Sequence, residues 1–216
     1  MVQRGSRGIG IFGGTFDPVH FGHLRAALEA SEYLGLDDFR LLPAGRPPHR
    51  TSPVASAEQR LAMLQTAVRR YPVFRVDDRE VRRPGESYMV DTLRAIRGEA
   101  GDMPLLLMVG QDAANELDRW HEWRRLFDLA HLVIMRRPGA AQDCSSTLAQ
   151  EMLPRFAASA AELMGLPAGR IWTIEVTQLA ISSTDIRKRL ASGRSASFLL
   201  PESVIDYIRA HGLYNG

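Results

Sequence analysis

Residues 13–23 of this chain read Gly-Gly-Thr-Phe-Asp-Pro-Val-His-Phe-Gly-His, and they directly follow the apolar run Gly8–Phe12. The apolar run is a predicted strand, and the apolar stripe within Phe21–Leu34 predicts a helix after it. A strand that ends in two glycines before a helix is typical of anion-binding sites, because glycine lets backbone amides approach a phosphate closely. The stretch therefore predicts a parallel α/β fold with a ligand site at a strand end.

Apolar runs alternate with helical patterns along the rest of the chain. The predicted strands are Gly8–Phe12, Phe39–Leu42, Val73–Val76, Leu105–Val109, Leu132–Met135 and Ile171–Val176. The predicted helices are Phe21–Leu34, a helix capped by Ser56 with Gln59 completing a capping box, Asp91–Arg97, Thr184–Leu190 and Pro201–His211. Residues 43–53, 110–112 and 138–146 are predicted loops or turns. This alternation favours a Rossmann-like, doubly wound parallel sheet with helices on both faces. We expect a single domain over residues 1–216, with a helical C-terminal part from about 182 to 216.

The composition narrows the function classes. The chain has 216 residues, 45% of them hydrophobic and 24% charged, with a formal net charge of +2. Basic and aromatic residues do not interleave as in a nucleic-acid groove, so no nucleic-acid partner is expected. Cys144 is the single cysteine, and no apolar run approaches the ~20 residues of a membrane span. We expect a soluble cytoplasmic protein without a membrane partner, either a monomer or a homo-oligomer.

The stretch 13–23 also carries side chains suited to phosphate chemistry. His20 and His23 are three residues apart in the first helical turn, so they share a face at the positive end of the helix. Thr15 adds a hydroxyl, Asp17 is expected to cap the helix, and Gly22 is expected to leave room for a ligand. The pattern predicts a site that stabilises an anion, especially one that gains charge in a transition state.

A second interpretation of the same region is a dinucleotide-binding fingerprint. Gly8, Gly10 and Gly13 have the G-x-G-x-x-G spacing. That fingerprint requires a strand before the glycines, whereas here they fall within the predicted strand. The spacing therefore does not favour a dehydrogenase.

Two later segments add candidate ligand groups. In Ile181–Arg187, Ser182 or Ser183 can cap a helix whose free amides suit an anion, with Arg187 on the same face. Taken alone, the segment fits a capped surface helix better, and the stretch 13–23 shifts the interpretation toward an anion site. Asp112, after the strand that ends near Gly110, suits a ribose hydroxyl or a helix N-cap.

These segments resemble the signatures of the (H/T)xGH nucleotidyltransferases. Residues 13–23 are similar to the first signature of that superfamily, and Ile181–Arg187 is similar to its I-S-x-T-x-x-R signature. The blocks Pro47–Arg50, Gly110–Asp112 and Leu199–Tyr214 narrow the resemblance. Over nearly the whole chain, the sequence resembles the bacterial nicotinate-nucleotide adenylyltransferase family.

The resemblance implies that nicotinate mononucleotide attacks the α-phosphate of ATP in line, giving deamido-NAD and pyrophosphate in NAD biosynthesis. It implies no covalent enzyme intermediate, and Mg²⁺ that is carried by the ATP phosphates and not by protein ligands. The implied catalytic residues are Thr15, His20, His23 and Arg187. The implied ATP-binding residues are Gly13, Gly14, Thr15, Phe16, His20, His23, Gly110, Asp112, Ile181, Ser182, Thr184 and Arg187. The implied nicotinate mononucleotide-binding residues are His49, Ser87, Tyr88, Trp120 and Arg137.

One position departs from the family pattern, and two alternative functions stay open. Met89 stands where the family often has a threonine, and a thioether cannot donate a hydrogen bond, so selectivity between nicotinate and nicotinamide forms is open. Trp123 is expected in the core. The alternatives are a phosphopantetheine or other mononucleotide adenylyltransferase and a non-catalytic nucleotide sensor.

Overall fold

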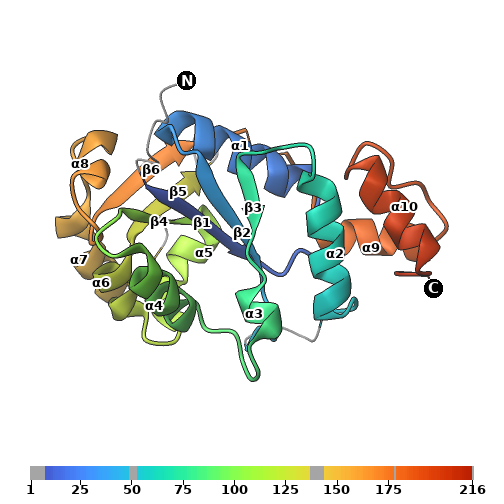
Figure 1. The fold of residues 1–216 in the computed structure, drawn as a ribbon, viewed down its shortest axis with the longest axis horizontal. Coiled ribbons are helices and arrows are strands. Elements are labelled where there is room, and N and C mark those ends of the chain that lie inside the picture. The colour runs from blue at the N-terminus through green and yellow to red at the C-terminus, as the bar shows by residue number, and fades with distance from the viewer. Residues whose placement is uncertain (1–7, 49–52, 137–143, 178, 216) are drawn as a thin grey trace.

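A computed structural model describes residues 8–48, 53–136, 144–177 and 179–215. Within these ranges six parallel strands form one sheet in the order β3-β2-β1-β4-β5-β6 (Figure 1). The strands are β1 (Ile9–Gly14), β2 (Asp38–Pro43), β3 (Phe74–Val76), β4 (Leu105–Gly110), β5 (His131–Arg136) and β6 (Ile171–Glu175). This arrangement confirms the predicted α/β class and its doubly wound parallel sheet.

Helices lie between the strands and after the last of them. They are α1 (Phe21–Leu34), α2 (Ala57–Val68), α3 (Arg79–Arg82), α4 (Met89–Ala100), α5 (Gln111–Asn115), α6 (Leu126–Leu129), α7 (Ser146–Met152), α8 (Ala160–Met164), α9 (Ser183–Ala191) and α10 (Glu202–Ala210). Short 3₁₀ turns cover Leu117–Arg119, Trp123–Arg125 and Leu153–Arg155. Every predicted strand and helix is confirmed, including the capping box of Ser56 and Gln59 on α2.

Helices cover both faces of the sheet because its strands alternate their side chains between two apolar clusters. In β4, Leu106 and Met108 join the cluster that contains residues of α1, α2 and α10. Leu105, Leu107 and Val109 join the cluster that contains residues of α4 and α6. Strands that are buried on both faces are the expected partner of a two-sided helical cover.

Several sequence-based boundaries are wrong. The predicted turn 110–112 is the start of α5, and the predicted loop 138–146 ends earlier because the Ser145 side chain accepts a hydrogen bond from the Leu148 amide and caps α7. Residues 138–143 lie outside the described part of the chain. Helix α4 begins at Met89, two residues before the predicted start. The short helices α3 and α5–α8 were missed because four to seven residues carry little helical periodicity.

The strand order reverses between β1 and β4. These two strands are neighbours, and Phe12 pairs with Met108, which brings the carboxyl ends near Gly14 and Gly110 to the same level. In doubly wound sheets, ligands bind beyond the carboxyl ends at this reversal point. The first motif (residues 13–23) therefore lies where the fold favours a ligand site.

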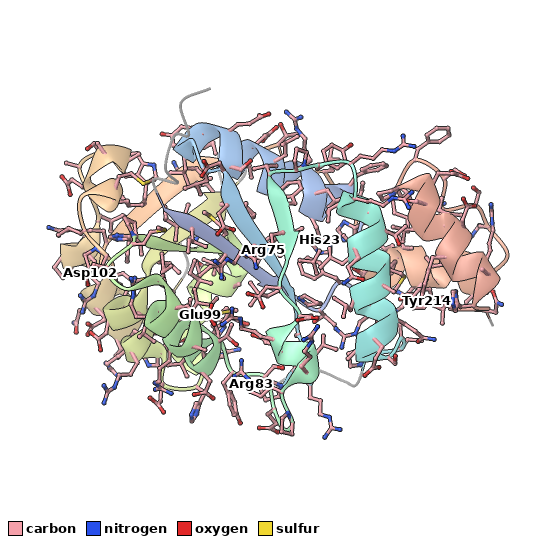
Figure 2. All side chains as sticks on the ribbon, viewed as in Figure 1. His23, Arg75, Arg83, Glu99, Asp102 and Tyr214 are labelled. Carbon is pink, nitrogen blue, oxygen red and sulfur yellow. The ribbon has the colours of Figure 1, made fainter. Side chains whose placement is uncertain are left out.

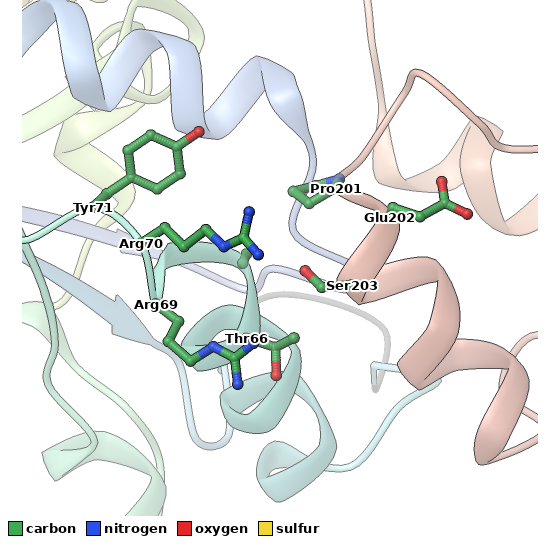
Figure 3. A pocket seen from close by; sticks show the side chains of 8 residues that line it. Thr66, Arg69, Arg70, Tyr71, Pro201, Glu202 and Ser203 are labelled. Atoms are coloured by element: carbon green, nitrogen blue, oxygen red, sulfur yellow. The ribbon is translucent and has the colours of Figure 1, made fainter.

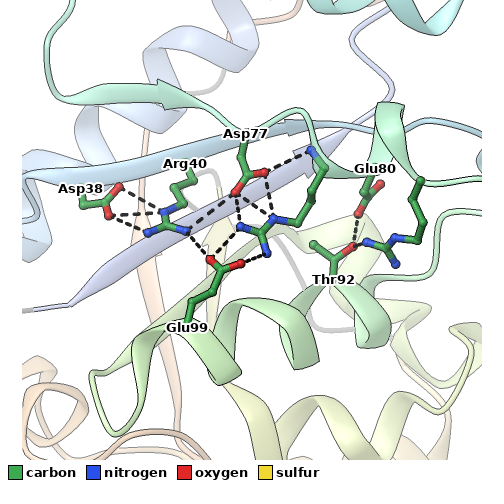
Figure 4. Close-up of polar contacts among 8 residues, drawn as sticks. Asp38, Arg40, Asp77, Glu80, Thr92 and Glu99 are labelled. Atoms are coloured by element: carbon green, nitrogen blue, oxygen red, sulfur yellow. Dashed lines mark hydrogen bonds and ion pairs between the residues drawn. The ribbon is translucent and has the colours of Figure 1, made fainter.

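A charged network joins α4 to the other half of the sheet. Arg40 on β2 pairs with Asp38 and Asp77, and Arg79 donates to both Asp77 and Glu99 of α4 (Figure 4). The Arg79 and Arg40 guanidinium groups hold the pKa of Asp77 below its usual value against the opposing effect of burial. The network ties the α4 helix to the β2–β3 edge.

Among the described helices, none has the length and apolar character needed to cross a membrane.

Candidate active site

His20 and His23 stack at the start of α1, with ring centroids 3.7 Å apart and ring planes inclined by 22°. His20 is 5% exposed, and within the described chain its Nδ1 is buried without a hydrogen-bond partner. Burial lowers the pKa of His20 to about 4, so its ring is neutral near pH 7. A buried polar atom without a protein partner is costly, which points to a ligand or water as the missing partner.

The surrounding side chains hold the His23 ring in place. The buried Phe16 ring meets His23 edge to face, with 5.1 Å between the ring centroids. Figure 2 locates His23 near the middle of the molecule. Because the Phe16 side chain lies in the core, only its backbone remains available for the predicted contact with ATP.

The glycines of the first motif make room for neighbouring side chains. A Cβ on Gly13 would lie 2.5 Å from the Met89 methyl group, and one on Gly14 would lie 2.9 Å from the Phe16 ring. A Cβ on Gly22 would lie 3.0 Å from the His20 ring, so this glycine leaves room for His20 and not simply for a ligand. The side chain of Met89 thus packs against the first motif.

The expectation that Asp17 caps α1 is wrong. The N-cap residue is His20, without a side-chain cap, and Asp17 lies three residues earlier. The buried Asp17 carboxylate instead accepts hydrogen bonds from the Val54 amide at 2.8 Å, the Ala55 amide at 3.2 Å and the Tyr214 hydroxyl at 2.6 Å. A buried carboxylate requires several donors, and these come from the loop before α2 and from the C-terminal tail.

The second motif (Ile181–Arg187) docks directly on the first. Ser182 caps α9 by accepting from the Asp185 amide at 3.1 Å, as predicted for one of the two serines. The Ser183 hydroxyl donates to the Pro18 carbonyl at 3.0 Å, and Arg187 Nη1 donates to the Asp17 carbonyl at 2.7 Å. The fold therefore joins two segments that lie more than 160 residues apart in sequence.

The predicted ATP-binding side chains of the second motif lie at the surface of the docked segment. Thr184 is exposed, and its hydroxyl accepts from Arg187 Nη2 at 3.4 Å. Ile181 and Ser182 line a hollow of about 260 Å³, together with the cationic side chains of Lys188, Arg189 and Arg194. The second motif thus combines a helix N-terminus with positive charge.

The end of β4 is open beside the first motif. Gly110 is the N-cap residue of α5, so the alternative that Asp112 is an N-cap is wrong. Asp112 is exposed in the first turn of α5, and a Cβ on Gly110 would meet nothing within 4 Å. The carboxylate is therefore available to a ligand at the strand end.

Two of the predicted acceptor-binding residues lie close together. The Tyr88 ring packs on the His121 ring, with centroids 4.3 Å apart, and Trp120 is the half-buried neighbour of His121 in the chain. Sequence reasoning did not select His121, although its position beside Trp120 offered a signal. Trp123 is buried, which confirms its expected place in the core.

Ser87 contacts the loop after β2. Its hydroxyl accepts from the Gly45 amide at 3.0 Å and the Arg46 amide at 3.2 Å, and its own amide donates to the Arg46 carbonyl at 2.9 Å. Ser87 therefore anchors this loop, and a direct contact with nicotinate mononucleotide stays a prediction. His49 and Arg137 lie outside the described residues.

A hollow of about 290 Å³ lies elsewhere, between the end of α2 and the start of α10 (Figure 3). It is lined by Arg69, Arg70, Tyr71 and the segment Pro201–Ser203, among others. None of the predicted site residues lines it. The chemistry-bearing groups gather at the carboxyl ends of β1 and β4, whereas Tyr71 precedes the amino end of β3.

The donor set of the site fits an anion. Among the residues that the structure describes, no group of three His, Cys, Asp or Glu side chains is arranged to hold a metal ion. The first and second motifs instead present imidazole, guanidinium, hydroxyl and amide donors. Phosphate oxygens accept from all of these groups, so the site fits the phosphates of a nucleotide directly.

Comparisons with known proteins agree with this geometry. A family model described as cytidylyltransferase-like matches residues 11–189. A probable nicotinate-nucleotide adenylyltransferase of Methylococcus capsulatus is 51% identical, over 95% of this chain and 99% of the relative. One of Dechloromonas aromatica is 49% identical, over 97% of this chain and 98% of the relative.

Solved structures show the same fold. Plasmodium falciparum nicotinic acid mononucleotide adenylyltransferase complexed with NaAD superposes with a TM-score of 0.73 at 16% identity, over 96% of this chain and 97% of that one. The same enzyme complexed with APC gives a TM-score of 0.70 at 15% identity, with 96% of each chain covered. At this identity the likeness concerns the fold, while the curated relatives carry the family assignment. This chain belongs to the cytidylyltransferase-like family and, within it, to the nicotinate-nucleotide adenylyltransferases, which are nucleotidyltransferases.

Proposed function

We propose that this protein transfers the adenylyl group of ATP to nicotinate mononucleotide, giving deamido-NAD and pyrophosphate in NAD biosynthesis. The observation that carries the proposal is the stacked pair His20 and His23 at the reversal point of the sheet, with the second motif docked on the Asp17–Pro18 backbone just before it. The curated relatives, which cover nearly the whole chain, bear the name of this activity.

The reaction requires positioning and charge stabilisation and needs no covalent enzyme intermediate. A phosphate oxygen of the mononucleotide attacks the α-phosphorus of ATP, and the bond to the pyrophosphate oxygen breaks with its electron pair leaving on pyrophosphate. His20 and His23 donate N–H groups to the α-phosphate oxygens, which gain charge in the transition state. The neutral His20 ring, which its lowered pKa favours, carries one N–H and can donate it to a phosphate oxygen.

The remaining groups orient the two substrates. The Gly13–Phe16 backbone and the Thr15 hydroxyl contact phosphate, Arg187 and Thr184 face the β- and γ-phosphates, and Ile181 and Ser182 lie beside the nucleotide. The Asp112 carboxylate, next to Gly110, accepts from the ribose. Trp120 and Tyr88 contact the pyridine ring, and His49, Ser87 and Arg137 complete the acceptor side, with Ser87 acting through the loop that it anchors. Mg²⁺ would arrive on the ATP phosphates and supply positive charge there.

Pyrophosphate release tests the proposal. The purified protein is supplied with ATP and Mg²⁺ and, in parallel, with nicotinate mononucleotide, nicotinamide mononucleotide or phosphopantetheine. Strong turnover with nicotinate mononucleotide alone is expected. Turnover with another acceptor alone would retain adenylyl transfer and overturn the acceptor assignment, and no turnover with any acceptor would favour a nucleotide sensor.

A further inference from the structure

Arg60 is a charged side chain in the core. It lies in α2, is 1% exposed, and donates through its whole guanidinium group to backbone carbonyls. The acceptors are Thr15 at 2.8 Å and Ala44 at 2.6 Å from Nη1, Gly45 at 2.9 Å from Nη2, and Ala55 at 3.3 Å from Nε. Burial lowers the pKa of Arg60, and the nearby Asp17 carboxylate opposes that shift.

These carbonyls belong to loops on both sides of the proposed reaction. Thr15 lies in the first motif, which we assign to ATP, whereas Ala44 and Gly45 begin the loop after β2, which leads toward the acceptor residues. The Gly45 amide then donates to the Ser87 hydroxyl, next to Tyr88. Arg60 therefore links the ATP loop to the acceptor side, beside the direct hydrogen bond from the Ala44 amide to the Gly14 carbonyl at 2.9 Å.

The loop before α2 closes this arrangement. The Ala55 carbonyl accepts a hydrogen bond from Arg60, and the Ala55 amide donates one to the Asp17 carboxylate. The buried cation and the buried anion therefore both bind the backbone of this residue. Each group is thereby satisfied, which a buried charge requires.

We propose that Arg60 is a positioning residue that sets the spacing between the ATP loop and the acceptor loop and so aligns the attacking phosphate with the α-phosphorus. The inference rests on the proposed function. A guanidinium is a rigid planar fork with donors in several directions, so it can hold carbonyls of two loops at fixed separations. A lysine ammonium, with one nitrogen on a flexible stem, lacks that geometry.

Arg97, which is half-buried where Arg60 is 1% exposed, provides a control with a similar set of acceptors in the same chain. It also donates to four carbonyls, at 2.6–2.8 Å: those of Gly101, Met103, Leu129 and Pro167. Three of these acceptors precede β4 and β5, at the amino ends of the strands and away from the proposed site. A lysine substitution at either arginine therefore disturbs a similar set of hydrogen bonds. Only the hydrogen bonds of Arg60 join the ATP loop to the acceptor loop.

The experiment compares Arg60→Lys, Arg60→Gln and Arg97→Lys with the wild type. Misplacement of reacting groups by ~1 Å costs on the order of 100-fold in rate, so Arg60→Lys should lower kcat by about 10- to 100-fold. The Kd of ATP and of nicotinate mononucleotide, each measured alone by calorimetry, should change far less than kcat. Arg97→Lys should lower Tm and keep the wild-type kcat below that temperature.

Amide hydrogen exchange gives a readout that does not depend on turnover. Peptides covering residues 14–16 and 44–46 should exchange faster in Arg60→Lys than in the wild type, and should be unchanged in Arg97→Lys. A wild-type kcat in Arg60→Lys, unchanged exchange in both loops, or failure of both Arg60 variants to fold would overturn the positioning role. If the wild type turned over no acceptor, the proposed function would fall, and coupled exchange of the two loops would still support the spacing role of Arg60.

Discussion

Two buried histidines, one at each end of the sheet, differ in how their ring nitrogens are used. His131 begins β5 at the amino ends of the strands. Its Nε2 lies 2.8 Å from the Leu166 carbonyl, and its Nδ1 accepts from the Arg170 amide at 3.0 Å. His20 lies at the carboxyl ends, where its buried Nδ1 has no partner in the described structure. Burial lowers the pKa of both rings.

The difference separates structural polar groups from functional ones. At the amino ends of the strands, the side chains of His131 and Arg97 form hydrogen bonds with backbone groups of the protein itself. At the carboxyl ends, burying His20 Nδ1 without a hydrogen-bond partner costs free energy in the unliganded protein, and under the proposed function a substrate supplies the missing hydrogen bond. The comparison predicts that equivalent changes at the two ends affect different measurable quantities.

The largest expected effect is the loss of an imidazole at the carboxyl ends. His20→Ala or His23→Ala should lower kcat by about 100-fold or more, as loss of a transition-state hydrogen-bond donor does. ATP binding should weaken less, because the ground state carries less charge on the α-phosphate. Pyrophosphate release gives kcat, and calorimetry with a non-hydrolysable ATP analogue gives Kd. A variant with near-normal kcat would remove that histidine from the catalytic set.

At the amino ends, the same kind of change should affect stability. His131→Leu leaves the Leu166 carbonyl and the Arg170 amide without partners, which should lower the free energy of unfolding by about 2–4 kcal/mol. Denaturant unfolding at pH 7.5 measures this loss. The folded variant should keep the wild-type kcat, and a loss of kcat as large as that of His20→Ala would break the comparison.

The pH dependence of stability sharpens the contrast further. Because the pKa of His20 falls from 6.5 to about 4 on folding, the unfolded chain binds a proton between these values that the folded chain does not. Stability is therefore full above pH 6.5 and declines as pH falls toward 4. Unfolding midpoints at pH 7.5, 6 and 5 should decline less steeply in His20→Asn than in the wild type. His131 contributes in the same direction and remains in both proteins, so equal slopes would contradict the role assigned to His20.

The smallest effects are expected when alanine replaces either of two helical glycines, Gly98 or Gly22. Gly98 lies exposed in α4 with open space around its Cβ position, so Gly98→Ala should stabilise the protein by about 0.5–1 kcal/mol without changing kcat. Gly22→Ala gains the same helical preference but places a methyl group 3.0 Å from the His20 ring. It should therefore lower kcat while changing Tm little. Equal kcat in the two variants would show that the His20 ring tolerates displacement.

The long periodic elements could be predicted from sequence. Helix α1 matches its predicted bounds, Phe21–Leu34, since fourteen residues repeat an apolar stripe several times. The helices α3 and α5–α8 have only four to seven residues, too few to repeat such a stripe. The sequence therefore did not predict them. A short helix is decided by its packing, which a local pattern does not contain.

The candidate site divides in a similar way. His20, His23 and Ser182 stand in compact motifs, so their types and spacing indicated their chemistry. The supporting groups could not be found in this way, because Arg60 reaches the Thr15 carbonyl across 45 residues of sequence. The sequence did contain one indication of its burial. Arg60 lies on the same helical stripe as the buried residues Met63, Leu64 and Ala67, so the apolar pattern places this arginine on the core-facing side of α2.

The bond between Asp17 and Tyr214 also sets an order of events during synthesis. These residues are separated by 197 positions, so a ribosome has made the whole first motif long before the hydroxyl that supports it exists. Until Tyr214 emerges, the Asp17 carboxylate lacks one of its donors and the turn before His20 lacks part of its support. The first motif therefore has its full set of supporting hydrogen bonds only after residue 214 has been made and has folded back onto Asp17.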